Sequence, residues 1–216
     1  MASTQSTSPN VRTTDLIVSQ DSETLQTIQD ALEQAPPGSR ILVRPGLYRE
    51  SLVLDKDIEL IADGPCEEVI IESPKGSCLQ MKTEHAHVQG FTLRSDKDAS
   101  RFSFTVAIQQ GQLLLEDCDI TSTHLACIAI RGSQTTPTIR RCKIHGSKDR
   151  GVFVFGGGLG LFEECEITGH TFAGVAISKH ANPIFRHCHI HGGKAGGVMV
   201  YEQGQGIFED CRITNN

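Results

Sequence analysis

Five cysteines recur at almost constant spacing in the second half of the chain. They are Cys118, Cys142, Cys165, Cys188 and Cys211, separated by 24, 23, 23 and 23 residues. Stacked thiols could bridge in pairs or bind a soft metal ion. The chain has no CxxC pair, however, and free cysteine is among the residue types most often buried. We therefore expect an internal column of free thiols that contributes packing and no redox or metal chemistry.

Histidine is the second residue type that offers chemistry. His187, His189 and His191 alternate along one short segment and would share a face of a strand, and His189 with His191 is the better chelating pair. A metal site requires three or four converging ligands with supporting groups. The neighbouring repeats offer Glu164, Glu166, Thr168, Asp210, Arg212 and Thr214, among which only part of a ligand set is recognisable. The sequence therefore predicts no metal site and no cofactor.

Charged residues flank each cysteine and alternate in sign from repeat to repeat. One column reads Glu116, Arg140, Glu163, Arg186 and Glu209, and another reads Asp119, Lys143, Glu166, His189 and Arg212. A catalytic interpretation would require two carboxylates that converge on a substrate. Almost every acid here has a base one repeat away. We therefore expect vertical ion pairs on an exposed face, each contributing little free energy.

Short strands are the elements that must position these residues. The segments LLEDCDI, TIRRCKI, LFEECEI, IFRHCHI and IFEDCRI align on the cysteines, and a second alternating segment recurs with the same period. A period of 23 residues with Gly-bearing turns leaves no room for a helix in the repeat. Apolar residues recur three positions before and two positions after every cysteine. This pattern predicts a parallel β-solenoid, in which coils pair at about 4.8 Å and like residues stack.

Glycine supplies the predicted corners of the coils. Gly146, Gly169, Gly192 and Asn215 stand four residues after a cysteine, and these residue types tolerate positive φ. A second set of glycines precedes the other strand of the repeat and is interpreted as a corresponding corner. This set consists of Gly151, Gly174 and Gly197.

The sequence of the first half of the chain predicts a helix followed by less regular coils. Residues 24–35 place Leu25, Ile28, Leu32 and Ala35 on one face at helical spacing, and a Pro-Pro-Gly turn follows. We expect this amphipathic helix to cap the first coil, because an open solenoid end exposes strand edges and apolar interior. A loop insertion is expected at 95–101, and regular repeats begin near residue 106. With a disordered tail at 1–14, this leaves one domain of about seven coils over 15–216.

Composition limits the class of protein. The 216 residues include 20 Lys and Arg against 26 Asp and Glu, a formal net charge of -6, which is unlike a nucleic-acid binder. No apolar run approaches the roughly 20 residues of a membrane span, and the N-terminus has no hydrophobic signal segment. The expectation is a cytoplasmic globular protein that binds neither nucleic acid nor membrane.

Two stretches carry a resemblance to a known superfamily. The segment TIQDALEQAPPGSRILVRPGLYRESLVL, followed by coils such as GVAISKHANPIFRHCHIHGGKAGGVMV, resembles the pectin-lyase-like right-handed parallel β-helix superfamily. The repeats are most similar to the carbohydrate-binding and sugar-hydrolysis type repeats of β-helix F-box proteins and their bacterial relatives. The resemblance implies an all-β fold and the right hand of the solenoid. In the F-box relatives asparagine is usual where the cysteine column stands here, and no F-box helices are recognisable in this sequence.

The resemblance also implies where an enzyme site would lie. Family lyases hold calcium with acidic residues on one sheet and use an arginine as base, and family methylesterases use two aspartates and an arginine. The outward columns of the second strand read Ala129, Phe153, Ala176 and Met199, and then Arg131, Phe155, Ser178 and Tyr201. These columns contain no acidic cluster, whereas an enzyme site should present converging polar groups.

This aromatic face is the predicted binding surface. The candidate residues are Arg131, Phe153, Phe155, Lys179, Met199 and Tyr201, because apolar side chains with a charged rim are typical of interfaces. The first hypothesis is a non-catalytic scaffold that binds a protein partner, or a glycan, and has no catalytic residue. The alternative is a polysaccharide lyase, esterase or epimerase that uses Lys179, His180, Arg131 or Tyr201 as acid or base. A covering loop or a further part of a longer chain is the third interpretation.

The last repeat predicts an open end. The interior of the final coil would be uncovered on its C-terminal side, where we expect Val198, Val200, Ile207 and Phe208. Solenoids normally carry capping repeats at such an end. We therefore expect either a longer parent solenoid or a homodimer that joins two C-terminal coils.

Overall fold

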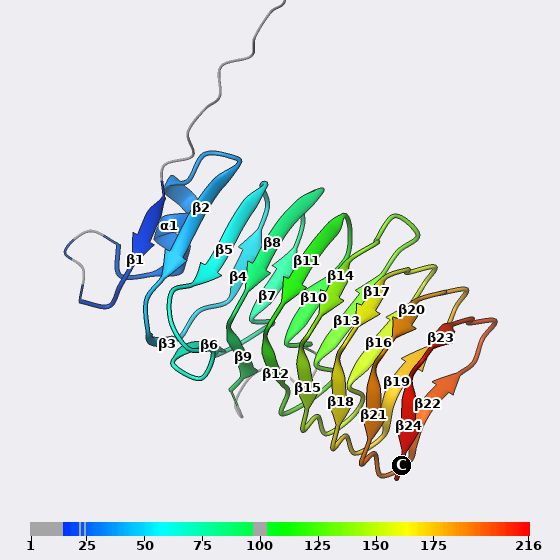
Figure 1. Cartoon of the computed structure of the whole chain (residues 1–216). Helices are drawn as coiled ribbons and strands as arrows, with labels where there is room; N and C mark the ends of the chain where they lie inside the picture. The colour runs from blue at the N-terminus through cyan, green and yellow to red at the C-terminus, as the bar shows by residue number, and fades with distance from the viewer. Residues whose placement is uncertain (1–14, 22, 24, 97–102) are drawn as a thin grey trace, which may run out of the picture.

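The chain winds into one parallel solenoid with a helix at its N-terminal end (Figure 1). The structure is a computed structural model and describes residues 15–21, 23, 25–96 and 103–216. The predicted tail at 1–14 and most of the predicted insertion at 95–101 lie outside these residues. Within the described part of the chain there are 24 strands and one helix, as the all-β prediction requires. No helix among these residues is long and apolar enough to cross a membrane.

Three parallel sheets, here called A, B and C, form the walls of the solenoid. Sheet A contains β1 Leu16–Val18, β2 Ser39–Val43, β5 Ile58–Ala62, β8 His85–Gln89, β11 Gln112–Glu116, β14 Thr138–Arg140, β17 Leu161–Glu163, β20 Ile184–Arg186 and β23 Ile207–Glu209. Sheet B contains β3 Gly46–Tyr48, β6 Val69–Ser73, β9 Thr92–Ser95, β12 Asp119–Thr121, β15 Lys143–His145, β18 Glu166–Thr168, β21 His189–His191 and β24 Arg212–Thr214. Sheet C contains β4 Leu52–Leu54, β7 Leu79–Met81, β10 Val106–Ile108, β13 Ile128–Arg131, β16 Val152–Phe155, β19 Ala173–Ile177 and β22 Gly196–Val200.

The eight strands of sheet B correspond to about eight coils, one more than predicted. The difference arises in the first half, where coil length varies. Residues paired in sheet A are 19, 28 and 27 positions apart along Ile41, Leu60, Val88 and Leu115, so no constant period marks these coils. From Leu115 onward the paired positions follow the predicted spacing of 24 and then 23 residues.

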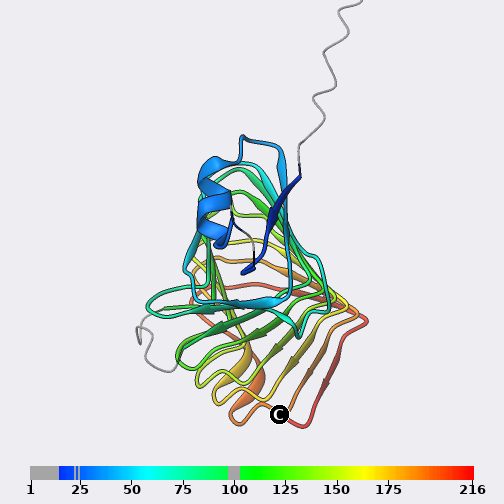
Figure 2. The same ribbon diagram turned by 90° about the vertical axis from the view of Figure 1, so that its left-hand side faces the viewer.

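The helix α1, Ile28–Gln34, covers the N-terminal end of the first coils (Figure 2). It is shorter than the predicted 24–35, because Thr27 caps it and accepts a hydrogen bond from the backbone N–H of Asp30. Glu50 accepts two further bonds from the N–H groups of Ile28 and Gln29, at 2.9 and 2.8 Å. The carboxylate therefore satisfies donors that the first helical turn leaves free.

The predicted apolar columns fill the interior. Ile139, Phe162 and Phe185 are fully buried in consecutive coils, and the Phe162 and Phe185 rings stack with centroids 4.5 Å apart. In the last coil of this chain Val200 is 48% exposed. The prediction for Ile207 was wrong. It stands in register with Ile184 in an outward column of sheet A, and it does not face the interior.

The cysteine column is confirmed as free and buried. Cys142, Cys165 and Cys188 are at most 2% exposed, whereas Cys211 in the last coil is half-buried. The thiols of Cys142, Cys165 and Cys188 each lie within 3.5 Å of a carbonyl oxygen of the preceding coil, for example Cys165 Sγ at 3.4 Å from the Ile139 oxygen. The thiol hydrogens thus have backbone carbonyl oxygens as acceptors.

The corners are only partly as predicted. Gly146, Gly169, Gly192 and Asn215 have φ values of 70°, 70°, 66° and 53°, which confirms the left-handed corner after sheet B. The corner between sheets A and B carries no glycine signal in the sequence, because it uses non-glycine residues in the same conformation. These residues are Asp117, Arg141, Glu164, His187 and Asp210.

The second set of glycines was wrongly interpreted as a left-handed corner. A Cβ atom on Gly151 would lie 2.6 Å from the oxygen of Gly174, and one on Gly174 would lie 2.8 Å from the oxygen of Gly197. None of the three has positive φ. Glycine is required at Gly151 and Gly174 because the backbone of the next coil approaches too closely for a side chain, whereas at Gly197 the side chains of Ile213 and Asn216 occupy the space.

Candidate functional site

The predicted aromatic face lies on the outside of sheet C. Phe153 and Phe155 of β16 are half-buried, and their rings stack with centroids 4.3 Å apart. The Arg150 guanidinium lies 4.9 Å from the centre of the Phe153 ring, and that of Arg131 lies 5.9 Å from the centre of the Phe155 ring. These are cation–π distances, so each of the two phenylalanine rings has a cation–π contact with an arginine.

The remaining predicted residues stand apart from this pair. Ala176 and Ser178 are buried and separate the phenylalanines from Met199 and Tyr201, which are half-buried one coil further on. Lys179 is exposed in the turn after β19. A hollow of about 80 Å³ adjoins Phe155 and Arg131, and its lining contains no carboxylate. The face can stack and bind anions, but the described hollow offers no carboxylate for acid-base work.

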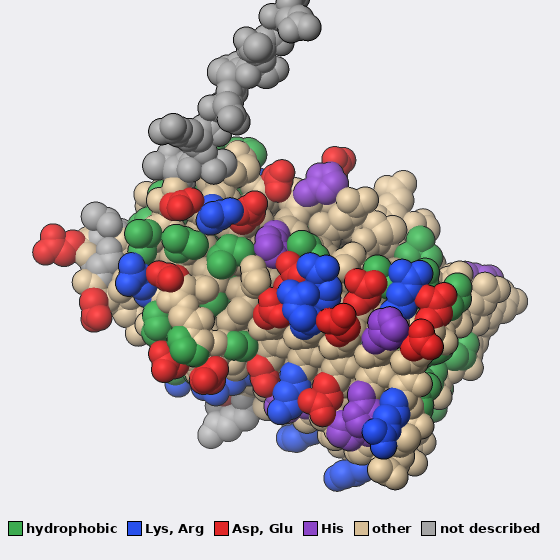
Figure 3. Space-filling view, in the orientation of Figure 1, with side chains coloured by type: hydrophobic (Ala, Val, Ile, Leu, Met, Phe, Trp, Pro, Cys, Tyr) green, Lys and Arg blue, Asp and Glu red, His purple; other side chains and the backbone are tan. Residues whose placement is uncertain are grey.

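A larger groove on the outside of sheet A was not predicted. It has a volume of about 610 Å³ and crosses four strands, β5, β8, β11 and β14. Its lining mixes polar and apolar residues and comprises Asp57, Ile58, Glu59, His85, Ala86, His87, Gln112, Leu113, Leu114, Thr136 and Thr138. Acidic, basic and histidine side chains gather together on this side of the molecule (Figure 3).

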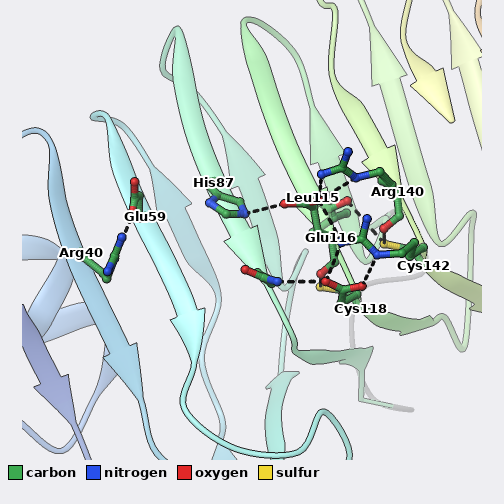
Figure 4. A network of polar contacts seen from close by, with 11 residues as sticks. Arg40, Glu59, His87, Leu115, Glu116, Cys118, Arg140 and Cys142 are labelled. Carbon is green, nitrogen blue, oxygen red and sulfur yellow. Dashed lines mark hydrogen bonds and ion pairs between the residues drawn. The ribbon is translucent and has the colours of Figure 1, made fainter. Parts of the chain in front are cut away.

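A buried carboxylate anchors a polar network beside this groove. Glu116 is 5% exposed, and its Oε2 lies 3.1 Å from Nε2 of His87. Its other oxygen, Oε1, accepts hydrogen bonds from Arg140 and, at 3.1 Å, from Arg141. In Figure 4 the imidazole of His87 points along the sheet towards Glu116, and Arg140 approaches from the other side. One carboxylate thus orients an imidazole that lines the groove.

The charge state of Glu116 follows from these partners. Burial opposes ionisation, but the hydrogen bond and charge of Arg140, the charge of His87 and the hydrogen bond of Arg141 outweigh it. The pKa of the carboxyl group is therefore held below its ordinary value. An ionised Glu116 contacts one ring nitrogen of His87 and so fixes the orientation of the imidazole. This is the arrangement of a general base held by a carboxylate.

The sequence shows the individual residues of this network but does not show that they lie side by side. The alternation of His85 and His87 predicts a shared face, and Glu116 belongs to the charge column that we interpreted as ion pairs only. The variable length of the early coils hides the register that places Glu59, His87 and Glu116 on adjoining strands.

The ion-pair prediction holds for one charge column and needs correction in the other. Arg186 lies 3.8 Å from Glu163 and 2.5 Å from Glu209, as vertical pairing predicts. In the second column the contacts are diagonal: His145 lies 2.7 Å from Asp119, and His191 lies 3.0 Å from Glu166. The diagonal arises because histidine reaches back one coil from the neighbouring outward position.

Comparison with known proteins supports the fold throughout the chain. A family model described as a right handed beta helix region matches residues 126–216. Pectin methylesterase PemA from Erwinia chrysanthemi is similar with a TM-score of 0.65 and 15% identity, covering 86% of this chain and 66% of that one. Pectate lyase Pel9A gives a TM-score of 0.70 and 11% identity over 86% of this chain and 56% of that one. This chain therefore spans about two thirds of the first structure and just over half of the second.

A third structure is covered more completely. The pectin methylesterase from Aspergillus niger has a TM-score of 0.63 and 13% identity, over 99% of this chain and 88% of that one. Identities this low establish the fold and leave the activity open. From the repeat match and these structures, the chain has a right-handed parallel β-helix fold, which it shares with the pectin methylesterases and the pectate lyase named above.

Proposed function

We propose that this chain is a carbohydrate-active protein that binds an acidic polysaccharide in the sheet A groove and acts on it with His87 as general base. The observation that carries this proposal is the His87–Glu116 pair, which stands at the edge of a groove that crosses four coils. The similar solved structures named above are enzymes of pectin, which favours this alternative over the scaffold hypothesis.

The dimensions of the groove are compatible with a sugar chain. Four strands spaced at about 4.8 Å extend over about 14 Å, which accommodates a short oligosaccharide. The polar side chains of His85, Gln112 and Thr136 are exposed along the lining and can bond to sugar hydroxyl groups. Leu114 contributes an apolar surface between them.

The charges beside the groove favour an acidic chain. Arg140 and Arg141 each have a side chain that is 40% exposed, although both contact Glu116. A guanidinium group has five N–H donors, so each arginine retains donors for a uronate carboxylate. His87 can remove a proton from water, as ester hydrolysis requires, or from the carbon next to a carboxylate, as β-elimination requires.

The test is turnover of polygalacturonate and of methyl-esterified pectin. A lyase yields an unsaturated product that absorbs in the ultraviolet, and an esterase releases methanol. We expect His87→Gln to lower the rate by about 100-fold or more, which is typical for loss of a general base. His145→Gln is the matched control, because His145 also pairs with a carboxylate, Asp119, but on sheet B.

Two results would contradict the proposal. One is a wild-type protein that neither turns over these polymers nor is retarded by them in affinity electrophoresis. The other is equal activity of His87→Gln and wild type.

The second candidate function is recognition of a protein or glycan by the sheet C face. It is favoured by the stacked pair Phe153 and Phe155 with their two arginines. If this face binds the ligand, the double variant Phe155→Ala and Tyr201→Ala loses binding while His87→Gln retains it. A partner held equally by wild type and the double variant would rule out this face.

A further inference from the structure

A cluster of metal-ligating side chains lies on the outside of sheet B. Glu166 begins β18, and His189 and His191 begin and end β21 of the next coil. Their ligand atoms all lie within 4.8 Å of one another. We infer that these three residues form a binding site for a divalent transition-metal ion such as zinc. This site is separate from the sheet A groove and does not depend on the function proposed for it.

Strand register creates the cluster. Glu166 is paired with His189 and Thr168 with His191, so all three ligands stand on the outward face. The Nε2 atom of His191 is 3.0 Å from Oε1 of Glu166. Bonds of about 2.0 to 2.2 Å to zinc place ligand atoms about 3.3 Å apart in a tetrahedral site. Small side-chain rotations are therefore sufficient to receive the ion.

Supporting groups hold both imidazoles. Thr168 Oγ1 lies 3.2 Å from Nδ1 of His191, which leaves Nε2 of that ring directed to Glu166. Thr214 Oγ1 lies 3.3 Å from Nε2 of His189. The two rings stack with centroids 4.0 Å apart. Hydrogen bonds to the second ring nitrogen fix the orientation of metal-binding histidines, and the cluster has such a bond on each ring.

The donor set selects the class of ion. Two imidazoles with one carboxylate suit zinc, nickel, cobalt or copper, whereas calcium and magnesium prefer oxygen ligands. All three residues are half-buried, so water has access to the remaining coordination positions. Two cations stand beside the cluster, Lys143 in register with Glu166 and Arg212 in register with His189. They oppose a metal cation, and removal of Arg212 should strengthen binding.

Zinc titration of the full chain against a chromophoric chelator tests the site. We expect one ion per chain, and a loss of affinity of about tenfold or more in His189→Gln, in His191→Gln and in Glu166→Gln. His145→Gln is the matched control, because this histidine of β15 has one carboxylate partner and stands outside the cluster. Arg212→Gln is expected to bind zinc more tightly than wild type.

Three outcomes would overturn the inference. The first is wild-type affinity in His189→Gln or His191→Gln. The second is an equal loss in His145→Gln. The third is a cobalt complex with a thiolate charge-transfer band, which would place the ion on the half-buried Cys66 or Cys211. Thermal unfolding with and without zinc provides a second readout, since only chains that bind the ion gain stability from it.

Discussion

Nε2 of His87 lies 3.1 Å from Oε2 of Glu116, although the two residues are 29 positions apart in the chain. The coil register brings them to adjoining strands, and Glu116 also holds Arg140 and Arg141. A single carboxylate therefore links three coils of the solenoid. Its loss should affect both the stability of the chain and the groove.

Glu116→Gln is expected to destabilise the fold by about 1 to 3 kcal/mol, because it leaves the arginines and His87 with a neutral partner. The folded-state pKa of Glu116 is depressed, so its contribution is complete above the unfolded-state pKa and is lost as pH falls through the folded value. The wild type should therefore lose stability in acid more steeply than Glu116→Gln. Urea unfolding at pH 7 and at pH 3 measures both effects, and parallel acid losses would contradict this prediction.

His170 predicts a second pH dependence. The ring is fully buried, accepts a hydrogen bond from the N–H of Ser147 and lies 3.1 Å from the oxygen of Ile144. Burial lowers its pKa to about 4 from an ordinary value of 6.5. The unfolded chain binds more protons between these values, so stability should fall by up to about 1.4 kcal/mol per pH unit as pH decreases from 6.5 to 4.

His170→Gln is expected to remove this slope, while His180→Gln in an exposed turn keeps it. Urea unfolding at half-unit steps of pH provides the measurement. Equal slopes in the wild type and His170→Gln would show that another group is responsible.

Gly151→Ala should be strongly destabilising, by several kcal/mol, or prevent folding. Its Cβ would lie 2.4 Å from Nε2 of His170 and 2.6 Å from a backbone oxygen. Gly196→Ala is the control, since nothing lies within 4 Å of a Cβ there. Thermal unfolding of the two variants should separate them clearly, and similar losses would argue against the close approach of the coils.

Phe185→Ala should cost about 3 to 5 kcal/mol, because the ring is fully buried between Phe162 and Phe208. Phe208→Ala should cost less, since this side chain is half-buried in the last coil. Equilibrium denaturation with an unchanged m-value provides the comparison. A larger loss at Phe208 would indicate that the last coil is covered in solution.

Thiol labelling should distinguish two of the eight cysteines from the rest. Cys66 and Cys211 are half-buried, and the other six are buried. Burial raises the pKa of Cys78 to about 12, which suppresses its reactive thiolate. Burial also raises the pKa of Cys211. We therefore expect the native chain to react first at Cys66, more slowly at Cys211 and not at the buried six, and the denatured chain to react at all eight. Rapid native labelling of Cys165 would contradict the buried column.

The regular half of the fold could be predicted because its coils repeat with one register. The residues that point inward around Cys142 and Cys165 can be predicted from their position in the repeat, and the structure confirms that they are buried. The groove could not be predicted in the same way. Its strands belong to coils of unequal length, so the pairing of Glu59 with His87 depends on where each turn ends and not on a sequence period.

Local chemistry also misled at two positions. Gly151 and Gly146 are the same residue type in the same repeat, but only Gly146 has positive φ. Conversely, Arg141 adopts positive φ without being glycine. A glycine in the sequence therefore does not by itself identify a corner. It can mark positive φ, as at Gly146, or a close approach of the next coil, as at Gly151.

The last coils have the same length and pair in the same register, so whole coils could be removed without changing the pairing of the rest. Leu161, Ile184 and Ile207 occupy equivalent positions, so a chain lacking residues 161–206 joins Gly160 to a position that already follows such a turn. This excision removes two coils and shortens the molecule by about 10 Å. The groove of the first half is left untouched. The length of the solenoid along its axis is thus set by the number of equivalent coils. Small-angle scattering of the shortened and the full chain measures that length directly.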